Sequence, residues 1–196
     1  LANMSHEIRT PINVMLGMNE MILRESESEE IRQYAKSIER SGGYLISLIN
    51  NILDISRIES GKMEIEEGKY ELRQLLDEVM LIAEKQAEQK SLKMNLIFDK
   101  TLPAYLIGDV IHIKQILLNL INNAVKYTKE GQIDIKVSKN EEETKLIFEV
   151  KDTGIGIKEE NLPVLFDAFM RVDSKKNKKI KGTGLGLAIA KQLVEQ

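Results

Sequence analysis

The sequence predicts an α+β protein in two parts, a helical hairpin followed by an α/β layered domain. Residues 1–58 carry apolar side chains at helical spacing and show no strand pattern. Beyond residue 68, long helical stretches alternate with short segments of alternating apolar and polar residues. Strands interleaved with long helices are typical of a sheet that is covered by helices on one face. The polar segment 59–68, which contains two glycines, is expected to be the linker between the two parts.

Composition and charge exclude several classes of protein. The net charge of −3 over 196 residues leaves no basic excess to neutralise phosphates, so we expect no nucleic-acid partner. The chain contains no cysteine, which excludes disulfides and thiolate sites. No signal peptide and no apolar run of about 18 residues is present, so we expect this chain to make no direct contact with a membrane.

The first part is expected to dimerise through an apolar seam. A polar break at residues 24–30 separates two helical patterns, and Ser28 can cap the second. The second pattern repeats alternately every three and four residues, as in coiled coils. One hairpin cannot bury such a stripe, whereas two copies packed as a four-helix bundle can. The seam positions are Ile31, Tyr34, Ile38, Ser41, Leu45, Leu48, Ile52 and Ile55.

Two adjacent glycines interrupt the second predicted helix. Gly42 and Gly43 each cost about 1 kcal/mol of helix stability relative to alanine. A double glycine in a helix is explained by close packing against a neighbouring helix or by a hinge, and we favour packing.

A histidine near the start of the chain is a candidate nucleophile. Glu7 follows His6 directly, and Thr10 shares its helix face because residues four apart lie one above the other. Pro11 crowds the carbonyl of Glu7, so we expect the helix to bend just past the histidine. A carboxylate beside an imidazole can hold its tautomer and accept a proton, which makes His6 a plausible nucleophile. For His6 taken by itself, an ordinary surface histidine is the alternative.

The first of three clusters in the second part lies on a helix predicted over Val110 to Tyr127. Asn119, Asn123 and Lys126 fall on one face of this helix. Amide oxygens four residues apart can reach Mg²⁺, which takes few protein ligands when phosphates supply the others. A solvated asparagine face is the alternative. We expect His112, which lies between apolar residues, to be partly buried or on the surface and to have no role.

The second cluster is Asp152–Ile157, directly after a strand predicted over residues 145–151. A carboxylate at the end of a strand can accept a hydrogen bond from the exocyclic amine of a base. Gly154 and Gly156 would let the backbone pass close to a ligand. A tight turn without a ligand is the alternative.

The third cluster is the glycine-rich run Lys181–Ile189, which opens the last predicted helix. Free backbone N–H groups and the helix dipole make such a helix start an anion site. No Lys-Ser or Lys-Thr pair follows the glycines and no strand precedes them, so neither the P-loop nor the dinucleotide-binding pattern applies. The lysine-rich segment 174–181 before it is either a lid over a nucleotide site or a solvated loop.

These motifs, taken in order, resemble the catalytic core of a two-component sensor histidine kinase over nearly the whole chain. The histidine motif Ser5–Pro11 comes first, the asparagine cluster and the two glycine clusters follow, and Leu165–Arg171 resembles the phenylalanine box of the family. The sequence of Asn3–Pro11 is most similar to that of hybrid kinases, which carry a receiver domain on the same polypeptide. The resemblance implies a dimeric hairpin domain over 1–58 and, over 69–196, an ATP-binding sandwich of the type shared with gyrase and Hsp90.

The resemblance also implies a role for each motif residue. His6 would accept the phosphoryl group, with Glu7 as general base. Thr10 would position water for dephosphorylation of the partner. Asn123 would bind Mg²⁺, and Asn119 would lie beside the phosphates as part of the catalytic group. The other implied ATP contacts are Lys126 and Tyr127 to phosphate and nucleotide, Asp152 to the adenine amine, Gly154 and Gly156 to the base, Arg171 to the γ-phosphate, and Gly182, Thr183, Gly184, Leu185 and Gly186 around the phosphates.

The implied activity is autophosphorylation from Mg²⁺-ATP, followed by transfer to an aspartate of a response-regulator receiver domain. The receiver would lie in cis in a hybrid kinase or in trans otherwise, and a phosphatase activity toward it is also implied. The chain would be a cytoplasmic domain of a protein anchored in the bacterial cytoplasmic membrane. A non-catalytic dimeric scaffold is the alternative from another class. A gyrase- or Hsp90-type ATPase is a third, against which the His6 motif and the hairpin argue.

The sequence departs from the family pattern at its end. The family usually continues after the last helix with a glycine pair and two more strands, whereas this sequence stops at Gln196. Helical patterns are also cut at both ends, since neither end shows a capping or stop signal. The ATP-binding domain is therefore expected to be incomplete at its C-terminal side.

Overall fold

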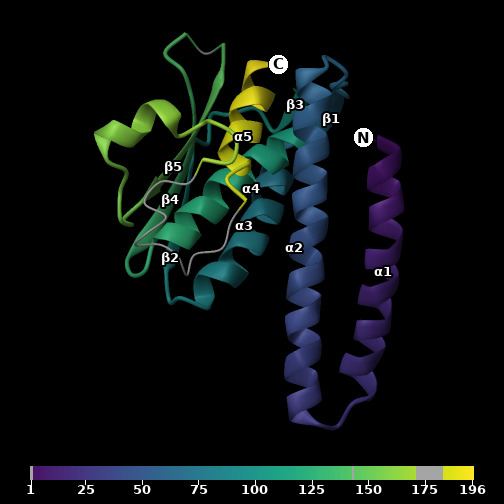
Figure 1. Ribbon diagram of the computed structural model, residues 1–196. Helices are drawn as coiled ribbons and strands as arrows, with labels where there is room; N and C mark the ends of the chain where they lie inside the picture. The colour runs from purple at the N-terminus through teal and green to yellow at the C-terminus, as the bar shows by residue number, and fades with distance from the viewer. Residues whose placement is uncertain (1, 143, 171–182) are drawn as a thin grey trace. The chain divides into compact units, whose positions relative to one another are not determined.

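The computed structural model describes residues 2–142, 144–170 and 183–196, and the chain divides into two compact units between Met63 and Glu64. For residues 2–6 only the backbone is described. Figure 1 labels the elements of both units. Their order is α1 (Ala2–Glu25), α2 (Glu29–Glu59), β1 (Gly68–Glu71), α3 (Leu72–Glu88), β2 (Lys93–Phe98), β3 (Tyr105–Gly108), α4 (Val110–Tyr127), β4 (Gln132–Lys139), β5 (Leu146–Asp152), the 3₁₀ helix η1 (Glu159–Val164) and α5 (Gly186–Glu195).

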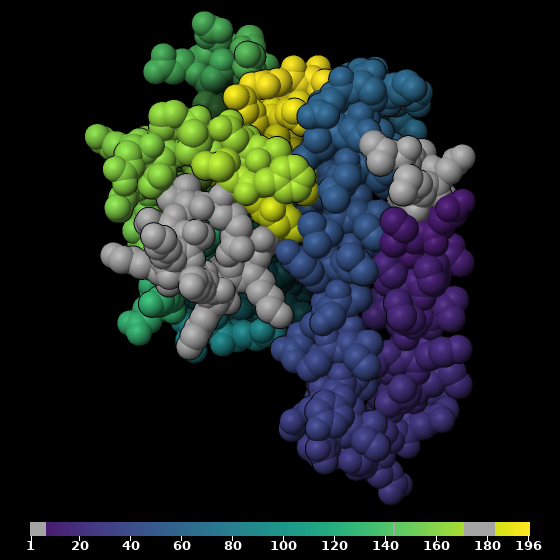
Figure 2. Space-filling model, in the orientation of Figure 1, coloured from purple at the N-terminus to yellow at the C-terminus, as the bar shows by residue number. Residues whose placement is uncertain are grey.

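The first unit is a hairpin whose helices α1 and α2 lie side by side (Figures 1 and 2). Helix α1 continues through Pro11 and ends at Glu25. Ser28 caps α2 as predicted, since its side chain accepts a hydrogen bond of 3.4 Å from the N–H of Ile31. Two glutamates in the first turn of α2 complement the positive end of the helix dipole.

The contact between the two helices of the hairpin is close. A Cβ atom at Gly42 would lie 2.6 Å from Cδ2 of Leu16, so the absence of a side chain at this position lets the helices approach. This confirms packing as the reason for Gly42, whereas a Cβ at Gly43 would meet nothing within 4 Å. Asn19 is buried between the helices, and its Nδ2 donates a hydrogen bond of 2.8 Å to the carbonyl of Ala35.

The predicted seam of α2 is only partly covered within the hairpin. Five of its apolar side chains stay between 42% and 61% exposed: Ile31, Tyr34, Ile38, Leu45 and Ile52. A hollow of about 400 Å³ opens between the helices and is lined by seam residues and by Ile12, Met15 and Leu16. One hairpin therefore leaves an apolar surface that it cannot bury by itself.

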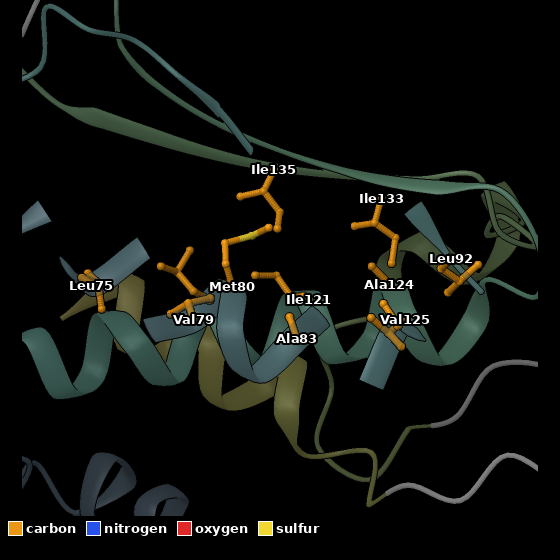
Figure 3. Packing of buried hydrophobic residues seen from close by; sticks show 12 residues of the cluster. Leu75, Val79, Met80, Ala83, Leu92, Ile121, Ala124, Val125, Ile133 and Ile135 are labelled. Atoms are coloured by element: carbon orange, nitrogen blue, oxygen red, sulfur yellow. The ribbon is translucent and has the colours of Figure 1, made fainter. Parts of the chain in front are cut away.

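The second unit is built on a three-stranded sheet in the order β2-β4-β5. Strand β4 pairs in parallel with β2 and antiparallel with β5, while β1 and β3 form a separate antiparallel pair. Ile133, Ile135 and Val137 alternate along β4 as fully buried residues, and Ile133 and Ile135 point toward side chains of α3 and α4 (Figure 3). The residues between them are more exposed, so one face of the sheet carries the core, as the sequence predicts.

Helices α3 and α4 supply the other half of this core, and α5 packs on α4. Leu75, Val79, Ala83 and Ile121 are at most 3% exposed. This layer holds the apolar face of α4 against the sheet. The other face of α4 carries the polar side chains.

The helix predicted over Val110 to Tyr127 has those bounds, and the strand predicted over residues 145–151 runs from Leu146 to Asp152, but three short elements were not predicted. Strands β1 and β3 have four residues each, and η1 has six with a proline inside. Such lengths hold too few repeats for periodicity to show. Strand β1 begins at Gly68, which the sequence analysis placed in the linker.

Candidate functional site

The histidine motif lies on α1. The backbone of His6 is helical, and the side chains of Glu7 and Thr10 are exposed. Arg9, in the same motif, donates from Nη2 to Oδ1 of Asn50 over 2.9 Å and so ties this part of α1 to α2. Sequence reasoning missed Asn50, because a residue 41 positions away leaves no local pattern. The side chain of His6 lies outside the described residues.

Helix α4 begins at a buried aspartate that has several partners. Oδ1 of Asp109 accepts from the N–H groups of Ile111 and His112 at 3.1 Å each. Oδ2 accepts from the N–H of Glu66 at 3.0 Å and lies 2.6 Å from Nδ1 of His112. Burial raises the pKa of the Asp109 carboxyl, but these hydrogen bonds outweigh it and hold the pKa below its ordinary value.

The ring of His112 is therefore engaged. It is partly buried, as expected, and no pattern in the sequence indicated that it would contact the residue that caps α4. Asp109 itself was a capping candidate in the sequence, since it directly precedes the predicted helix over Val110 to Tyr127.

The predicted asparagine face of α4 meets the start of α5. A Cβ atom at Gly186 would lie 3.3 Å from Oδ1 of Asn119, so the missing side chain brings the two elements together. Nδ2 of Asn119 is buried and has no hydrogen-bond partner among the described residues. Asn123 and Lys126 are partly exposed further along, and Nζ of Lys126 lies 4.7 Å from the centre of the Tyr127 ring. An unpartnered amide beside a helix start fits a polar ligand there.

The side chains near Asn123 fit a metal ion that takes most of its ligands from bound phosphates and water. Within the described residues, no group of three or more His, Cys, Asp or Glu side chains could hold a metal ion. Any Mg²⁺ near Asn123 would therefore need most of its ligands from phosphate oxygens and water, which is its usual preference. Asn122, whose Oδ1 is also buried without a hydrogen-bond partner within residues 2–142, 144–170 and 183–196, was not predicted.

The Asp152 loop turns tightly against the end of α4. Oδ1 of Asp152 accepts a hydrogen bond of 2.8 Å from the N–H of Gly154. A Cβ at Gly154 would lie 2.7 Å from both Asp152 Oδ1 and the carbonyl oxygen of Tyr127. Ile155 donates to that carbonyl over 3.4 Å. The turn is thus present, and it also brings the exposed carboxylate next to the residues that end α4.

Gly131, another glycine close to the Asp152 loop, was not among the predicted residues. Gly131 has a φ of +114°, and a Cβ there would lie 2.2 Å from Oγ1 of Thr153. That hydroxyl accepts from the N–H of Gln132 at 3.0 Å, so the turn before β4 is locked to the Asp152 loop. Thr128, just before this turn, is fully buried, and its Oγ1 has no hydrogen-bond partner in the part of the chain that the structure describes.

The second glycine cluster shapes the start of α5. Gly184 has a φ of +75°, and a Cβ there would lie 2.9 Å from the carbonyl oxygen of Met170. The carbonyl of Gly184 accepts a hydrogen bond of 3.0 Å from the N–H of Phe169. Thr183 accepts from the N–H of Leu185 at 3.1 Å, and Leu185 is fully buried. These contacts require glycine at 184 and set the direction of the helix start.

Three predicted regions are thus brought together in the second unit. The middle of α4 lies beside the start of α5, and the end of α4 lies beside the Asp152 loop. Arg171, Gly182 and the lysine-rich segment lie outside the described residues. The combination of an amide face, a carboxylate on a glycine turn and a helix start is suited to a ligand with a base and phosphates.

Each of the two parts of the chain matches a known protein family. Residues 1–61 match the family described as the His Kinase A (phospho-acceptor) domain. Residues 108–196 match the family described as histidine kinase-, DNA gyrase B- and HSP90-like ATPases. The chain therefore consists of a phospho-acceptor domain followed by an ATPase domain. With both domains in this order, the chain belongs to the histidine kinase family.

Similar proteins bear the same description. The chain is 41% identical over 196 residues to hybrid signal transduction histidine kinase B of Dictyostelium discoideum, covering 98% of the chain and 10% of that protein. The crystal structure of full-length ShkA with AMPPNP is 31% identical, with a TM-score of 0.81 over 99% of this chain and 40% of that one. Histidine kinase ThkA in complex with response regulator protein TrrA is 26% identical, with a TM-score of 0.61 over 99% of this chain and 53% of that one.

The chain thus spans a small part of its curated relative. Among the residues that the structure describes, no helix combines the length and apolar character needed to cross a membrane.

Proposed function

We propose that this chain transfers the γ-phosphoryl group of ATP to His6 and passes it on to an aspartate of a receiver domain. The observation that carries the proposal is the unpartnered amide of Asn119 against the glycine start of α5, in the same unit as the Asp152 loop. The match of residues 1–61 to the phospho-acceptor family supports His6 as the acceptor.

The reaction needs little covalent chemistry from the protein. The bond between the γ-phosphorus and the oxygen that bridges it to the β-phosphate breaks, a bond from phosphorus to a ring nitrogen of His6 forms, and ADP leaves. Glu7 is proposed to take the proton from the ring. When bound, Mg²⁺ would neutralise charge on the phosphate oxygens, with Asn123 as its protein ligand.

The remaining predicted residues would bind and orient the nucleotide. Asp152 is proposed to accept from the adenine amine, with Gly154 and Gly156 beside the base. Lys126 and Tyr127 lie at the end of α4, from which a cation and a phenol can reach phosphate and nucleotide. Arg171 is proposed to reach the γ-phosphate. The residues proposed to surround the phosphates are Gly182, Thr183, Gly184, Leu185 and Gly186.

Two chains are proposed to form the working unit. The exposed seam of α2 and the hollow beside it would be covered by a second hairpin in a four-helix bundle. The complex of ThkA with a response regulator supports a receiver domain as the partner, supplied either in cis or in trans. Thr10 is proposed to position water when the phosphorylated receiver is hydrolysed.

We also propose that the chain works in the cytoplasm, where ATP is available, as part of a longer protein anchored in the bacterial cytoplasmic membrane. The alternative of a dimeric scaffold without catalysis has no observation in its favour.

The test is incubation of the chain with γ-labelled ATP and Mg²⁺. We expect acid-labile, base-stable label on the protein, as for phosphohistidine. His6→Gln should abolish the label and leave ATP affinity within about threefold of the parent, because His6 lies in the other unit from the nucleotide motifs. Persistent label on the His6→Gln variant would overturn the assignment.

The matched control is the only other histidine of the chain. His112→Gln removes an imidazole from the second unit, and this variant should keep its label at temperatures where it remains folded. Equal loss of label in both variants would instead indicate damage to the fold.

A further inference from the structure

Lys90 contacts the end of α4 although it lies 35 or more residues away along the chain. Its Nζ donates to the carbonyl oxygens of Val125 at 2.6 Å, Lys126 at 3.0 Å and Thr128 at 3.3 Å. None of the sequence motifs includes this lysine, and no role in the reaction follows from its position in the chain.

The local backbone explains how the ammonium reaches this place. After α3 ends at Glu88, Ser91 takes a φ of +57°, which reverses the chain. Leu92 then enters the core, in the same buried cluster as Ala124 and Val125 (Figure 3). Lys90 is thereby held beside the last turn of α4 on a short and well-anchored segment.

The ammonium completes the hydrogen bonding of a helix end that has no glycine cap. The carbonyl of Ala124 accepts from the N–H of Thr128, and that of Tyr127 accepts from the N–H of Ile155. The remaining carbonyls, those of Val125 and Lys126, have Lys90 as donor. A positive charge here also opposes the negative end of the helix dipole.

This helix end belongs to the proposed nucleotide site. It carries the side chains of Lys126 and Tyr127, and through the Tyr127 carbonyl it supports the loop that follows Asp152. A shift of this turn would move a proposed phosphate contact and a proposed base contact together.

We propose that Lys90 is a positioning residue of the nucleotide site, whose ammonium fixes the end of α4 against the Asp152 loop. This inference rests on the proposed function, because it assigns Lys90 to the site that binds ATP. Lys90 itself touches neither the nucleotide nor the phosphoryl group.

The test replaces the ammonium and then restores it. Lys90→Met keeps most of the side-chain length and removes the charge and the donors. We expect the Kd for ATP to rise about fivefold to tenfold at a temperature where the variant is fully folded. KM for ATP should rise by a similar factor, while kcat for labelling of His6 stays within about twofold, because the chemical groups are untouched.

Restoration uses the absence of cysteine from the chain. In Lys90→Cys the new thiol is unique, and alkylation with 2-bromoethylamine adds an amine at nearly the position of Nζ. ATP affinity should return to within about twofold of the parent, whereas methylthiolation of the same thiol, which adds no charge, should not restore it.

Lys114, on α4, supplies a matched control. Its Nζ lies 2.6 Å from Oε2 of Glu78 on α3, so it is also a lysine that contacts α4 or lies on it, but near the other end of α4. Lys114→Met should change ATP affinity by less than about twofold. An equal loss in both lysine variants, or no rescue by aminoethylation, would overturn the positioning role.

A second readout does not depend on nucleotide. In the free chain, amide hydrogen exchange of Ile155 should accelerate in Lys90→Met and in unmodified Lys90→Cys, and aminoethylation of the latter should restore it, while exchange of Ile135 in the core stays unchanged. Unchanged exchange at Ile155 contradicts the inference even if the parent fails to bind ATP. A different result would overturn the inference and leave the proposed function intact: the parent binds ATP and Asp152→Asn weakens this binding, but Lys90→Met does not weaken it.

Discussion

The two units of the chain differ in how far each one buries its own apolar side chains. In the hairpin, the contact between α1 and α2 buries Ile12, Asn19 and Ala35 and leaves most of the seam exposed. In the second unit, β4 and two helices enclose a continuous core of fully buried side chains. The second unit therefore has a closed core of its own, whereas the hairpin leaves an apolar surface that it does not cover.

The largest effect is expected from charges placed in the seam. The parent should scatter light as a dimer, with twice the chain mass of 22.3 kDa. Leu45→Glu combined with Ile52→Glu should shift it toward monomer at micromolar concentration, because like charges would be buried in the bundle. ATP affinity should stay within about threefold, since the site belongs to the other unit.

The control places the same charges outside the seam. Lys36→Glu combined with Ser47→Glu changes exposed positions of the same helix and should leave the mass unchanged. A monomeric parent would remove the bundle, and with it the contrast between the two units.

A smaller but clear effect is expected from a cavity in the core of the second unit. Ile121 is fully buried among α3, α4 and β4 side chains, so Ile121→Ala should lower the free energy of unfolding of this unit by about 2–5 kcal/mol. Ile111→Ala, at a 68% exposed position of the same helix, should change it by less than about 0.5 kcal/mol. Denaturant unfolding measures both. Similar losses would show that α4 is not held by its apolar face.

The next effect concerns ligand binding. Asp152→Asn should weaken ATP binding roughly tenfold or more, since a charge-assisted hydrogen bond contributes about 1.5–3 kcal/mol. Discrimination against GTP should fall as well, because guanine presents a carbonyl where adenine presents an amine. Calorimetry measures both affinities, and Asp134→Asn, on the outer face of the sheet, serves as the control. Unchanged affinity for ATP would reduce Asp152 to a turn residue.

The smallest effect is expected at the start of α4. Asp109→Asn should lower the free energy of unfolding at neutral pH by about 1–2 kcal/mol, because the contacts with His112 and Glu66 weaken. The folded state lowers the pKa of Asp109, so its contribution is complete above the unfolded value of 3.8 and is lost as the pH falls through the folded value.

The difference between parent and Asp109→Asn should therefore shrink below about pH 4. Unfolding curves at several pH values measure it. Asp77→Asn removes a carboxylate from an exposed ion pair of α3 and should leave the unfolding curve nearly unchanged at neutral pH. A difference that stays constant down to pH 2 would contradict the charged role of Asp109.

The sequence by itself determined the two-part organisation, the long helices and the central strands. Burial imposes a period of 3.6 on a helix and of 2 on a strand, and β4 and α4 are long enough for the period to show. Some motif residues also have local reasons that the sequence can show, because Gly184 takes a positive φ, which favours glycine, and Asn119 lies on one helix face with Asn123. Even Asp109, which caps α4, could have been read from the residues around it.

Only the tertiary structure decided which distant residues meet. Asn19 with the carbonyl of Ala35, Thr153 with Gly131 and Lys90 with the end of α4 are joined by hydrogen bonds or close contacts across 16 or more residues. A single polar side chain carries no period, and a lysine in a sequence reads as solvated until the fold sets unpaired carbonyls around it. Periodicity reports that a residue is buried, whereas its partner depends on the packing of whole elements, and that packing exists only once the chain has folded.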